Sequence, residues 1–418
     1  MDYFVTDYNM SCPPGAECAV LEDSIMQKGR PATAGSKILE NFISPIDATV
    51  VTRLEAAGIK ILGKTKMDEF GAAGLFPDSA AGVSGAVSAV ADGIATYAFC
   101  NDYTGAVRQQ AAERGVCYIH PTYGTVSRYG LIPAVPSMDQ IGIVCRTPEE
   151  GSRALSVMAG RDGKDGAVFD NARSTVDYGQ WAVDIKQIRI GEPVNVFADI
   201  PDAADALELI KGFKTVDFKL EYYDIYSVVM RILCGAEISS SLTRYDGVKF
   251  GYRARGFGDL RELYTKSRTE ALGPDAKLVS LLGAMALSQG CYEKYYEKAM
   301  RIRRLIKNSV KFDKYDIIVM PATGAGGDAD LALHALPQLC GLPAVTVPSK
   351  SGDRTTPGSR TKPDGGTMPD GVATPSGGTT PDGGTMPDGG TKPGSGITFI
   401  AEAGNDMMLL AALKAVTQ

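Results

Sequence analysis

Short apolar runs alternate with longer small-residue or amphipathic segments along the first part of the chain. Three helices are expected, at 47–57, 81–91 and 106–114. Each helix is expected to be followed by a buried strand, at 59–63, 94–99 and 116–119 respectively. Asp47 is placed to cap the first helix, and Gly58 to end it. This alternation predicts the α/β class: a mostly parallel sheet with helices on both faces.

The same alternation continues in the second half of the chain. A helix is expected after Thr147, and others at 202–211 and 292–308. Strands are expected at 187–191, 216–220, 315–321 and 340–348. At 418 residues the chain is long enough for one large α/β domain or for two modest ones. We expect residues 1–350 and 397–418 to form one domain.

A low-complexity tract interrupts this domain near its C-terminal end. From Thr361 to Gly396 a hexad occurs six times, beginning with Thr-Lys-Pro-Asp-Gly-Gly at 361–366. Proline and Asp-Gly favour a turn in each hexad, and no apolar residue is available to offset the entropy of ordering. We therefore predict that 351–396 is a disordered inserted loop. A repeating β-solenoid is the alternative, although the hexads lack the aliphatic residue that stacks in such folds.

Composition narrows the class of protein. The net charge of −6 argues against a stand-alone nucleic-acid binder, and only two histidines are present, so a histidine-rich metal site is not expected. We expect no cofactor. No run of about 18 apolar residues predicts a membrane span, and we expect a cytoplasmic protein. The eight cysteines are dispersed and are expected to be reduced.

The candidate chemistry lies between residues 81 and 130. This stretch contains a small-residue segment at 82–93, the loop Cys-Asn-Asp-Tyr-Thr-Gly-Ala-Val-Arg-Gln at 100–109, and Pro-Thr-Tyr-Gly at 121–124. It resembles the amidase signature family, in which two glycine-serine loops carry a serine nucleophile and a second serine that relays protons to a lysine base. The resemblance covers roughly residues 19–350 and 397–418. It implies an α/β fold with a large mixed, mostly parallel sheet and helices on both faces.

The three positions that carry this family's catalytic side chains hold other residues here. Gly105 and Arg108 align the second loop, so that Ala106 takes the nucleophile position. By the same resemblance Gly82 takes the position of the relay serine, and Glu22 that of the lysine. A methyl group cannot attack a carbonyl carbon, and glycine has no hydroxyl group to relay a proton. The resemblance therefore predicts that no catalytic residue is intact.

The surrounding loop is also altered. Tyr103, Thr104 and Gly105 occupy the family's oxyanion loop, and Thr104 stands where the family has a glycine whose N–H helps to bind the oxyanion. Two roles are open for Glu22: a base in a site rebuilt for other chemistry, or a structural carboxylate paired with a nearby Lys or Arg.

The substrate-binding residues that the resemblance implies are Arg303 and Tyr252. Arg303 matches an arginine that grips a glutamine carboxylate in the subgroup described below. The subgroup also has an acidic residue that holds the amino group of glutamine, and its position falls on Leu331 in this chain. Asp328 and Asp330 are close enough to be alternatives for that position.

The segment 242–253 (Leu-Thr-Arg-Tyr-Asp-Gly-Val-Lys-Phe-Gly-Tyr-Arg) resembles an insertion found in the A subunits of tRNA-dependent glutamyl amidotransferases. That resemblance implies the B and C subunits as partners, with tRNA contacted only through them. Two functions follow. The first is a catalytically inactive scaffold or regulator, and the second is a functioning glutamine-hydrolysing subunit that supplies ammonia to convert Glu-tRNA(Gln) to Gln-tRNA(Gln). A decayed gene product is a third interpretation.

Overall fold

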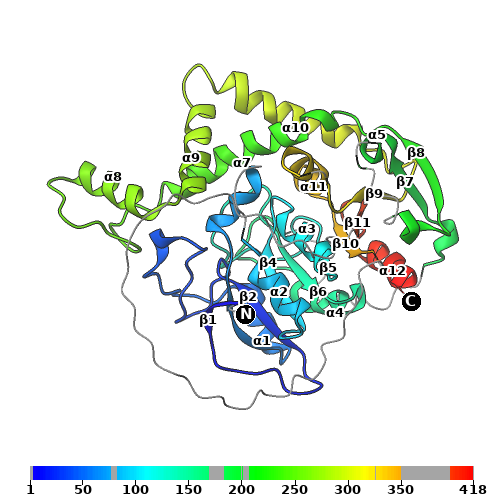
Figure 1. The fold of residues 1–418 in the computed structure, drawn as a ribbon, viewed down its shortest axis with the longest axis horizontal. Coiled ribbons are helices and arrows are strands. Elements are labelled where there is room, and N and C mark those ends of the chain that lie inside the picture. Colours follow the sequence, from blue (N-terminus) through cyan, green and yellow to red (C-terminus); the bar gives the residue numbers. More distant parts are fainter. Residues whose placement is uncertain are drawn as a thin grey trace, which may run out of the picture.

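A mixed sheet of eleven strands runs through the computed structural model, which describes residues 3–76, 82–168, 183–198, 200, 207–324, 326–349 and 396–417 (Figure 1). The strands are β1 Phe4–Asp7, β2 Cys18–Glu22, β3 Lys60–Thr65, β4 Tyr97–Asn101, β5 Cys117–His120, β6 Ile141–Cys145, β7 Arg189–Pro193, β8 Lys214–Phe218, β9 Ile317–Pro321, β10 Ala344–Pro348 and β11 Gly396–Ala401. Their order across the sheet is β1-β3-β2-β4-β6-β5-β10-β11-β9-β7-β8.

Helices lie between and beside these strands. The α-helices of the described chain are α1 Thr49–Ala56, α2 Gly85–Ala91, α3 Ala106–Glu113, α4 Pro148–Met158, α5 Val194–Phe197, α7 Tyr226–Leu242, α8 Leu260–Ala271, α9 Pro274–Ala286, α10 Lys298–Ser309, α11 Asp328–Cys340 and α12 Asp406–Thr417. The shorter helical turns are 3-10 turns at Lys37–Leu39, Glu69–Gly71, Ala73–Leu75, Ile185–Gln187, Glu208–Ile210 and Tyr223–Ile225, and a π turn at Glu293–Glu297.

The α/β class and the mixed sheet are confirmed, but the expectation that the sheet is mostly parallel is wrong. Four of the pairings between described strands are parallel (β2 with β3 and β4, β7 with β8 and β9), and six are antiparallel. The strands β6, β10 and β11 account for most of the difference, since each pairs antiparallel with both of its neighbours. A buried run of apolar residues does not specify the direction in which a strand enters the sheet.

Alternate residues of the strands face two separate layers of helices, as expected. Leu21 and Phe99 belong to a core shared with residues of α1, α4 and α12 on one face. Val20 and Ala98, one position earlier on the same strands, pack with α2 on the other face. Further along that second face, α7, α9 and α11 build the largest core of the molecule, above the sheet in Figure 1. The period of two along each strand explains this division.

The antiparallel pair β10 and β11 joins the two ends of the sheet. β10 pairs with β5 on one side, and β11 pairs with β9 on the other. Pro348 and Gly396 are register partners, so the two ends of the long connection between these strands lie side by side. The predicted loop 351–396 falls, apart from Gly396, outside the described residues.

Several predicted boundaries move in the structure. Asp47 does not cap α1, which begins after Ala48; its Oδ1 instead accepts the backbone N–H of Lys28 at 2.7 Å. The helix predicted from residue 81 begins at Gly85, and the Ser84 side chain accepts a hydrogen bond from Val87 in its first turn. Cys340, predicted as strand, ends α11 instead. Part of the helix predicted at 202–211 lies outside the described residues, and its end is the 3-10 turn at Glu208–Ile210.

The prediction that all cysteines are reduced is wrong for two of them. Cys12 and Cys18 form a disulfide, with Cα atoms 5.7 Å apart. Their six-residue separation spans the turn that leads into β2. The other six cysteines form no disulfide within the described chain.

One described segment, Tyr223–Leu242, is long and apolar enough to cross a membrane by length and composition alone. In this fold 61% of its most apolar 18-residue window is buried. Most of the segment is α7, which packs against α9 and α11 inside the protein.

Candidate functional site

The loop between β4 and α3 is built around the carboxylate of Asp102. Its Oδ1 accepts the backbone N–H groups of Gly105 (2.9 Å) and Val107 (3.1 Å), and its Oδ2 accepts the backbone N–H and the side-chain Nε–H of Arg108. Arg108 is fully buried and lies 3.3 Å from Asp102 as an ion pair. These bonds satisfy the free N–H groups at the start of the helix, so the loop keeps a defined shape.

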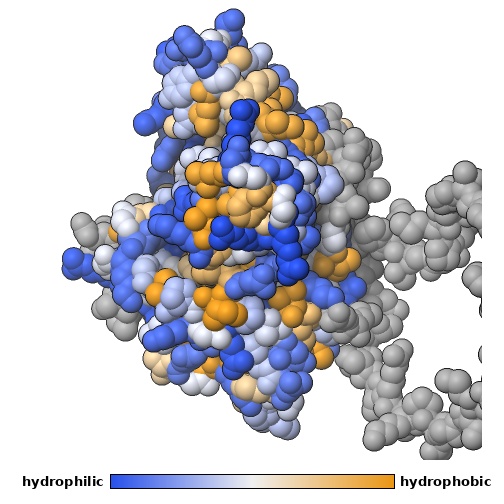
Figure 2. Space-filling model, turned by 90° about the vertical axis from the view of Figure 1, so that its left-hand side faces the viewer, coloured by the Kyte–Doolittle hydropathy of each residue, from blue (hydrophilic) through white to orange (hydrophobic). Residues whose placement is uncertain are grey.

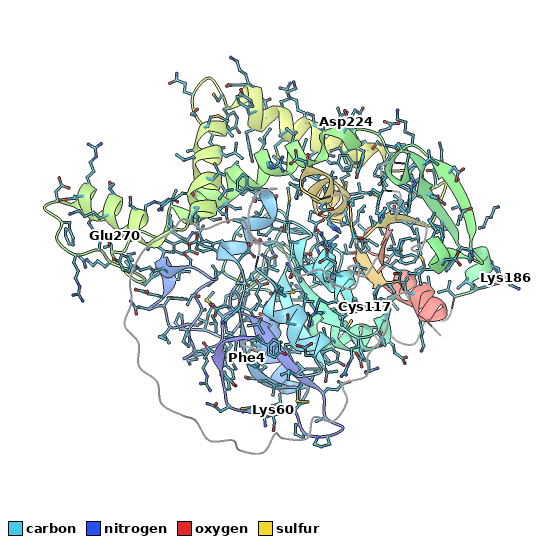
Figure 3. All side chains as sticks on the ribbon, in the orientation of Figure 1. Phe4, Lys60, Cys117, Lys186, Asp224 and Glu270 are labelled. Atoms are coloured by element: carbon cyan, nitrogen blue, oxygen red, sulfur yellow. A yellow bond between two sulfur atoms is a disulfide. The ribbon has the colours of Figure 1, made fainter. Side chains whose placement is uncertain are left out.

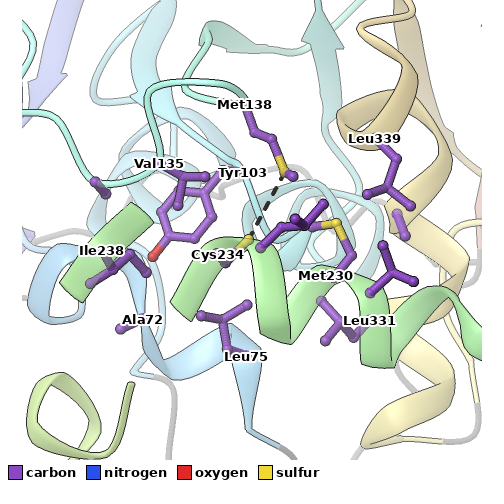
Figure 4. Packing of buried hydrophobic residues seen from close by; sticks show 14 of the residues in the cluster. Ala72, Leu75, Tyr103, Val135, Met138, Met230, Cys234, Ile238, Leu331 and Leu339 are labelled. Carbon is purple, nitrogen blue, oxygen red and sulfur yellow. Dashed lines mark hydrogen bonds between the residues drawn. The ribbon is translucent and has the colours of Figure 1, made fainter. Parts of the chain in front are cut away.

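The next three residues of the loop point to different places. Tyr103 is 2% exposed, donates its hydroxyl to the Phe70 carbonyl at 2.8 Å, and packs near Cys234 and Ile238 of α7 (Figure 4). The side chain of Thr104 lies over Gly74, where an added Cβ would be 2.6 Å from its Oγ1. Gly105 has a positive φ of 90° and lies against His334 of α11.

A cavity of about 360 Å³ opens at the N-terminus of α3. Ala106 lies in its wall, with Ala73 and Gly74 on one side and α11 on the other. The remaining lining residues are Phe76, Val83, Thr104, Gln109, Gln110, Glu113, Arg114, Gly327, Asp330, Leu331 and His334. The volume is in the range of sites that take small organic ligands.

Two carboxylates of this cavity share one amide. Nε2 of Gln109 donates to Oε1 of Glu113 and to Oδ2 of Asp330, each at 3.1 Å, and so links α3 to α11. Burial raises the pKa of Glu113, and the charge of Asp330 raises it further. Two carboxylates with one shared donor repel each other unless a proton or a cation relieves the repulsion.

His334 lies in the same wall and is 1% exposed. Neither of its ring nitrogens makes a hydrogen bond of normal geometry to a described residue, although the Ala322 backbone is close enough to raise the pKa of the imidazole slightly. Burial lowers the pKa of His334 to about 3, and the charge of Arg108 adds to the effect. The imidazole is therefore neutral at physiological pH.

Glu22 lies elsewhere, at the end of β2. It lines a second, much smaller cavity of about 10 Å³, which Ser24, Asn101 and Tyr103 also line. Ala106 does not line this second cavity, and Glu22 does not line the first. The two positions that the sequence aligned with a base and a nucleophile therefore lie in separate spaces.

The pairing expected for Glu22 is wrong. Its Oε1 accepts the hydroxyl of Ser24 at 2.5 Å, while the nearby Lys64 pairs with Asp23 at 3.9 Å. Burial raises the pKa of Glu22 to about 8; the Ser24 hydrogen bond only partly opposes this, and the charges of Asp68 and Asp102 add to it. Glu22 is therefore mostly protonated at neutral pH, and a neutral carboxylic acid needs no cationic partner.

Gly82 lies on the approach to α2, across from α3. Its carbonyl accepts a hydrogen bond from Nε2 of Gln110 at 3.4 Å, and Oε1 of Gln110 accepts the N–H of Ser84 at 2.7 Å. A Cβ at Gly82 would meet no described atom within 4 Å. A side chain at this position is therefore sterically tolerated.

The two residues assigned to substrate binding lie outside both cavities. The Arg303 guanidinium donates to the carbonyls of Leu339 and Ser137 and to the Ser137 hydroxyl, so it holds α10, α11 and the loop before β6 together. Tyr252 donates its hydroxyl to Glu270, which lies on α8 at the left-hand edge of the molecule (Figure 3). Neither residue lines the cavity at Ala106.

The part of the chain that forms this cavity is also similar in sequence to known proteins. The model of the family described as Amidase matches residues 19–329. This chain belongs to that family. It is 40% identical over 331 residues to the A subunit of the glutamyl-tRNA(Gln) amidotransferase of Lachnoclostridium phytofermentans, covering 73% of this chain and 67% of that one. It is 35% identical over 367 residues to the A subunit of the same enzyme from Acinetobacter baumannii, covering 78% and 74%.

Solved structures support the same fold. The A subunit of the glutamyl-tRNA(Gln) amidotransferase of Thermotoga maritima has a TM-score of 0.69 and 24% identity, covering 99% of this chain and 86% of that one. The peptide amidase of Stenotrophomonas maltophilia has a TM-score of 0.70 and 22% identity, covering 96% and 82%. At these identities the structures establish the fold alone.

Sequence reasoning missed several polar members of this amidase-fold cavity, among them Glu113 and His334, and left Asp330 as one of several alternatives. Glu113 follows Gln109 by four residues on α3, which places both on one helix face and could have indicated it. His334 follows Asp330 by four residues on α11 in the same way. Nothing local shows that the two helix faces meet.

Proposed function

We propose that this amidase-family chain is a catalytically inactive homologue of the A subunit of glutamyl-tRNA(Gln) amidotransferase, with a scaffold or regulatory role in the cytoplasm. The observation that carries the proposal is the separation of Glu22 from Ala106 into two cavities, with a methyl group at the second position. Acyl transfer through a serine needs a nucleophile within hydrogen-bond reach of its base. Here the nucleophile position has no hydroxyl group, and the base position holds a neutral acid.

The loop geometry supports this proposal. Asp102 and Arg108 keep the helix start in place, so the substitution at Ala106 changes the chemistry without changing the frame. Thr104, in the oxyanion loop, uses its hydroxyl to accept the Ala106 N–H at 3.4 Å. That N–H is then less available to a ligand oxyanion.

The test is ammonia release from glutamine and asparagine by the purified chain. We expect none above a buffer control, and the single variant Ala106→Ser should release none either, because the base and the relay are still absent. Release from wild type within about a hundredfold of an intact homologue would establish the alternative, a functioning glutamine-hydrolysing subunit, since loss of nucleophile and base removes far more than that.

An exposed apolar face supports the scaffold role. Leu278, Leu281 and Met285 are 49%, 69% and 43% exposed, and their spacing places them along one side of α9. Figure 2 shows apolar residues in patches among polar ones on the side of the molecule that carries α8 and α9. We propose that the companion B and C subunits dock on this chain, with tRNA held by them.

Co-expression with B and C subunits, followed by size-exclusion chromatography, tests the docking. A specific interface of roughly 1,600 Å² survives the column. Leu281→Glu should abolish co-elution, whereas Ile43→Glu, at another exposed apolar residue, should leave it intact. Recovery of this chain alone, beside a complex formed by an intact A subunit under the same conditions, would refute the scaffold.

A further inference from the structure

The cavity at Ala106 contains more hydrogen-bonding groups than the described residues satisfy. Both nitrogens of His334 are buried without a partner there, and so is Oδ1 of Asp330. A buried polar atom without a partner costs free energy comparable to a lost hydrogen bond, so such atoms normally face water or a ligand. Their convergence on a cavity of about 360 Å³ indicates a binding site.

The charge of the cavity favours a cation. Glu113 and Asp330 both line it and share a single amide donor, Nε2 of Gln109. Among the described lining residues the one cationic side chain is Arg114, which is already paired with Asp92 at 3.0 Å. Two carboxylates against one neutralised guanidinium leave a net negative site, in which a ligand with charged N–H donors forms short, strong hydrogen bonds.

His334 fits the same ligand. A neutral imidazole has one nitrogen lone pair, which accepts a hydrogen bond from an N–H donor. Because its pKa is lowered to about 3, it adds no positive charge that would repel a cation at physiological pH. Phe76 and Leu331 give the cavity an apolar wall for the rest of the ligand.

The cavity also differs from a site for an amino acid. A glutamine-like ligand needs a cation for its carboxylate, and the arginine expected for that role, Arg303, is bound to the Ser137 and Leu339 backbone outside the cavity. The described wall therefore matches the nitrogen end of a ligand but offers no free cation to its carboxylate.

We propose that this cavity binds a small organic cation with N–H donors, of the amidinium, guanidinium or primary amine class, which lacks a carboxylate. The donors are directed to the carboxylates of Asp330 and Glu113 and to the His334 imidazole. This inference deepens the proposed regulatory role. It rests on the proposed function in one respect: the chain binds the ligand and does not turn it over.

Three probes of the same shape distinguish the possible chemistries: benzamidinium, neutral benzamide and benzoate. Isothermal titration calorimetry on the full chain should show benzamidinium binding at least about tenfold more tightly than the other two, because only it donates from a charged group. Tighter benzamide binding would indicate an amide site, and tighter benzoate binding an anion site at Arg114. Either result, equal binding of all three, or no binding of any at millimolar concentration overturns the proposal.

Variants locate the site. Asp330→Asn and Glu113→Gln should each weaken benzamidinium binding about tenfold or more, while Asp328→Asn should not. Asp328 lies on the same helix, but it is exposed, pairs with Arg231 and does not line the cavity. Circular dichroism checks that each variant folds. If Asp330→Asn does not fold, Glu113→Gln alone tests the site. Unchanged affinity in the folded variants refutes the site. Because ammonia release and equilibrium binding are separate measurements, failure of the proposed function is distinguishable from failure of this inference.

Discussion

The Cα of Gly105 and the side chain of His334 are in direct contact, so closely that a Cβ on Gly105 would lie 2.0 Å from the Cβ of His334. The loop after β4 and the helix α11 can approach this closely only because position 105 has no side chain. The positive φ of 90° at Gly105 adds a second requirement for glycine.

This contact predicts that Gly105→Ala is strongly destabilising, by at least about 3 kcal/mol, since strain at positive φ and a clash with a buried side chain add together. Gly115→Ala is the matched control at the other end of α3. Its φ is 71°, but an added Cβ meets nothing within 4 Å, so it should cost only about 1 kcal/mol. Urea unfolding followed by circular dichroism measures both; equal costs would show that the contact with His334 is looser than described.

Removal of the Asp102 carboxylate should be more damaging than removal of an exposed ion pair. Asp102→Ala leaves the fully buried Arg108 without its charge partner and frees the N–H groups at the start of α3. We expect a loss of about 3–5 kcal/mol. Lys211→Ala breaks the exposed pair with Glu208 and should change stability by less than about 1 kcal/mol. A small effect at Asp102 in the same denaturation assay would contradict this account of the loop.

The buried acid Glu22 predicts a pH-dependent stability. Its pKa is about 8 in the folded protein against 4.5 for the exposed group, so above pH 4.5 the unfolded chain releases a proton that the folded chain keeps. The folded state then loses stability as the pH rises from about 4.5 to about 8, and no further loss follows above that range. Glu22→Gln, which stays neutral, should remove this slope and be more stable than wild type by a few kcal/mol at pH 9.

The measurement is urea unfolding of wild type and Glu22→Gln at pH 5, 7 and 9. The difference between the two proteins isolates Glu22 from other titrating groups, such as Asp68, whose pKa burial raises to about 6. Glu40→Gln, at an exposed position, should follow the wild-type curve. A variant that loses stability in parallel with wild type would mean that Glu22 is ionised in the folded state.

The register of β10 and β11 predicts that the long connection between them is dispensable. Pro348 and Gly396 are already paired, so a short glycine-containing turn can replace residues 350–395 without moving either strand. We expect the melting temperature to stay within a few degrees or rise slightly, because a shorter loop costs less entropy to close. Differential scanning calorimetry of the deletion decides the point, and a large fall would show that the tract contributes to the folded core.

The elements that could be predicted from the sequence are those with a local signal, such as a periodic pattern of apolar residues. β3, α3 and β9 lie within a few residues of their predicted places, because their apolar periods and flanking glycines are local signals. The long α7 was not predicted, since a helix that is apolar on most sides has no clear period. Strand direction was missed for a related reason: partners such as β5 and β10 are far apart in the chain.

The same limit applies to the site. The position of Ala106 at a helix start could be predicted, because the loop before it has a recognisable sequence. The neighbours Asp330 and His334 come from α11, more than two hundred residues later, and no local pattern brings that helix face to α3. The Ser24 partner of Glu22 is only two residues away, but its choice over Lys64 depends on burial, which the sequence does not show.

The placement of β11 has a consequence for the order in which the chain is synthesised. Until residues 396–401 leave the ribosome, β9 and β10 each lack one neighbour, and the sheet consists of two parts with unsatisfied backbone groups facing each other. Such exposed apolar edges bind other strands readily. A message truncated anywhere before β11 would therefore yield a product that chaperones or proteases recognise, because residues 396–401 are needed to join the two parts of the sheet into one.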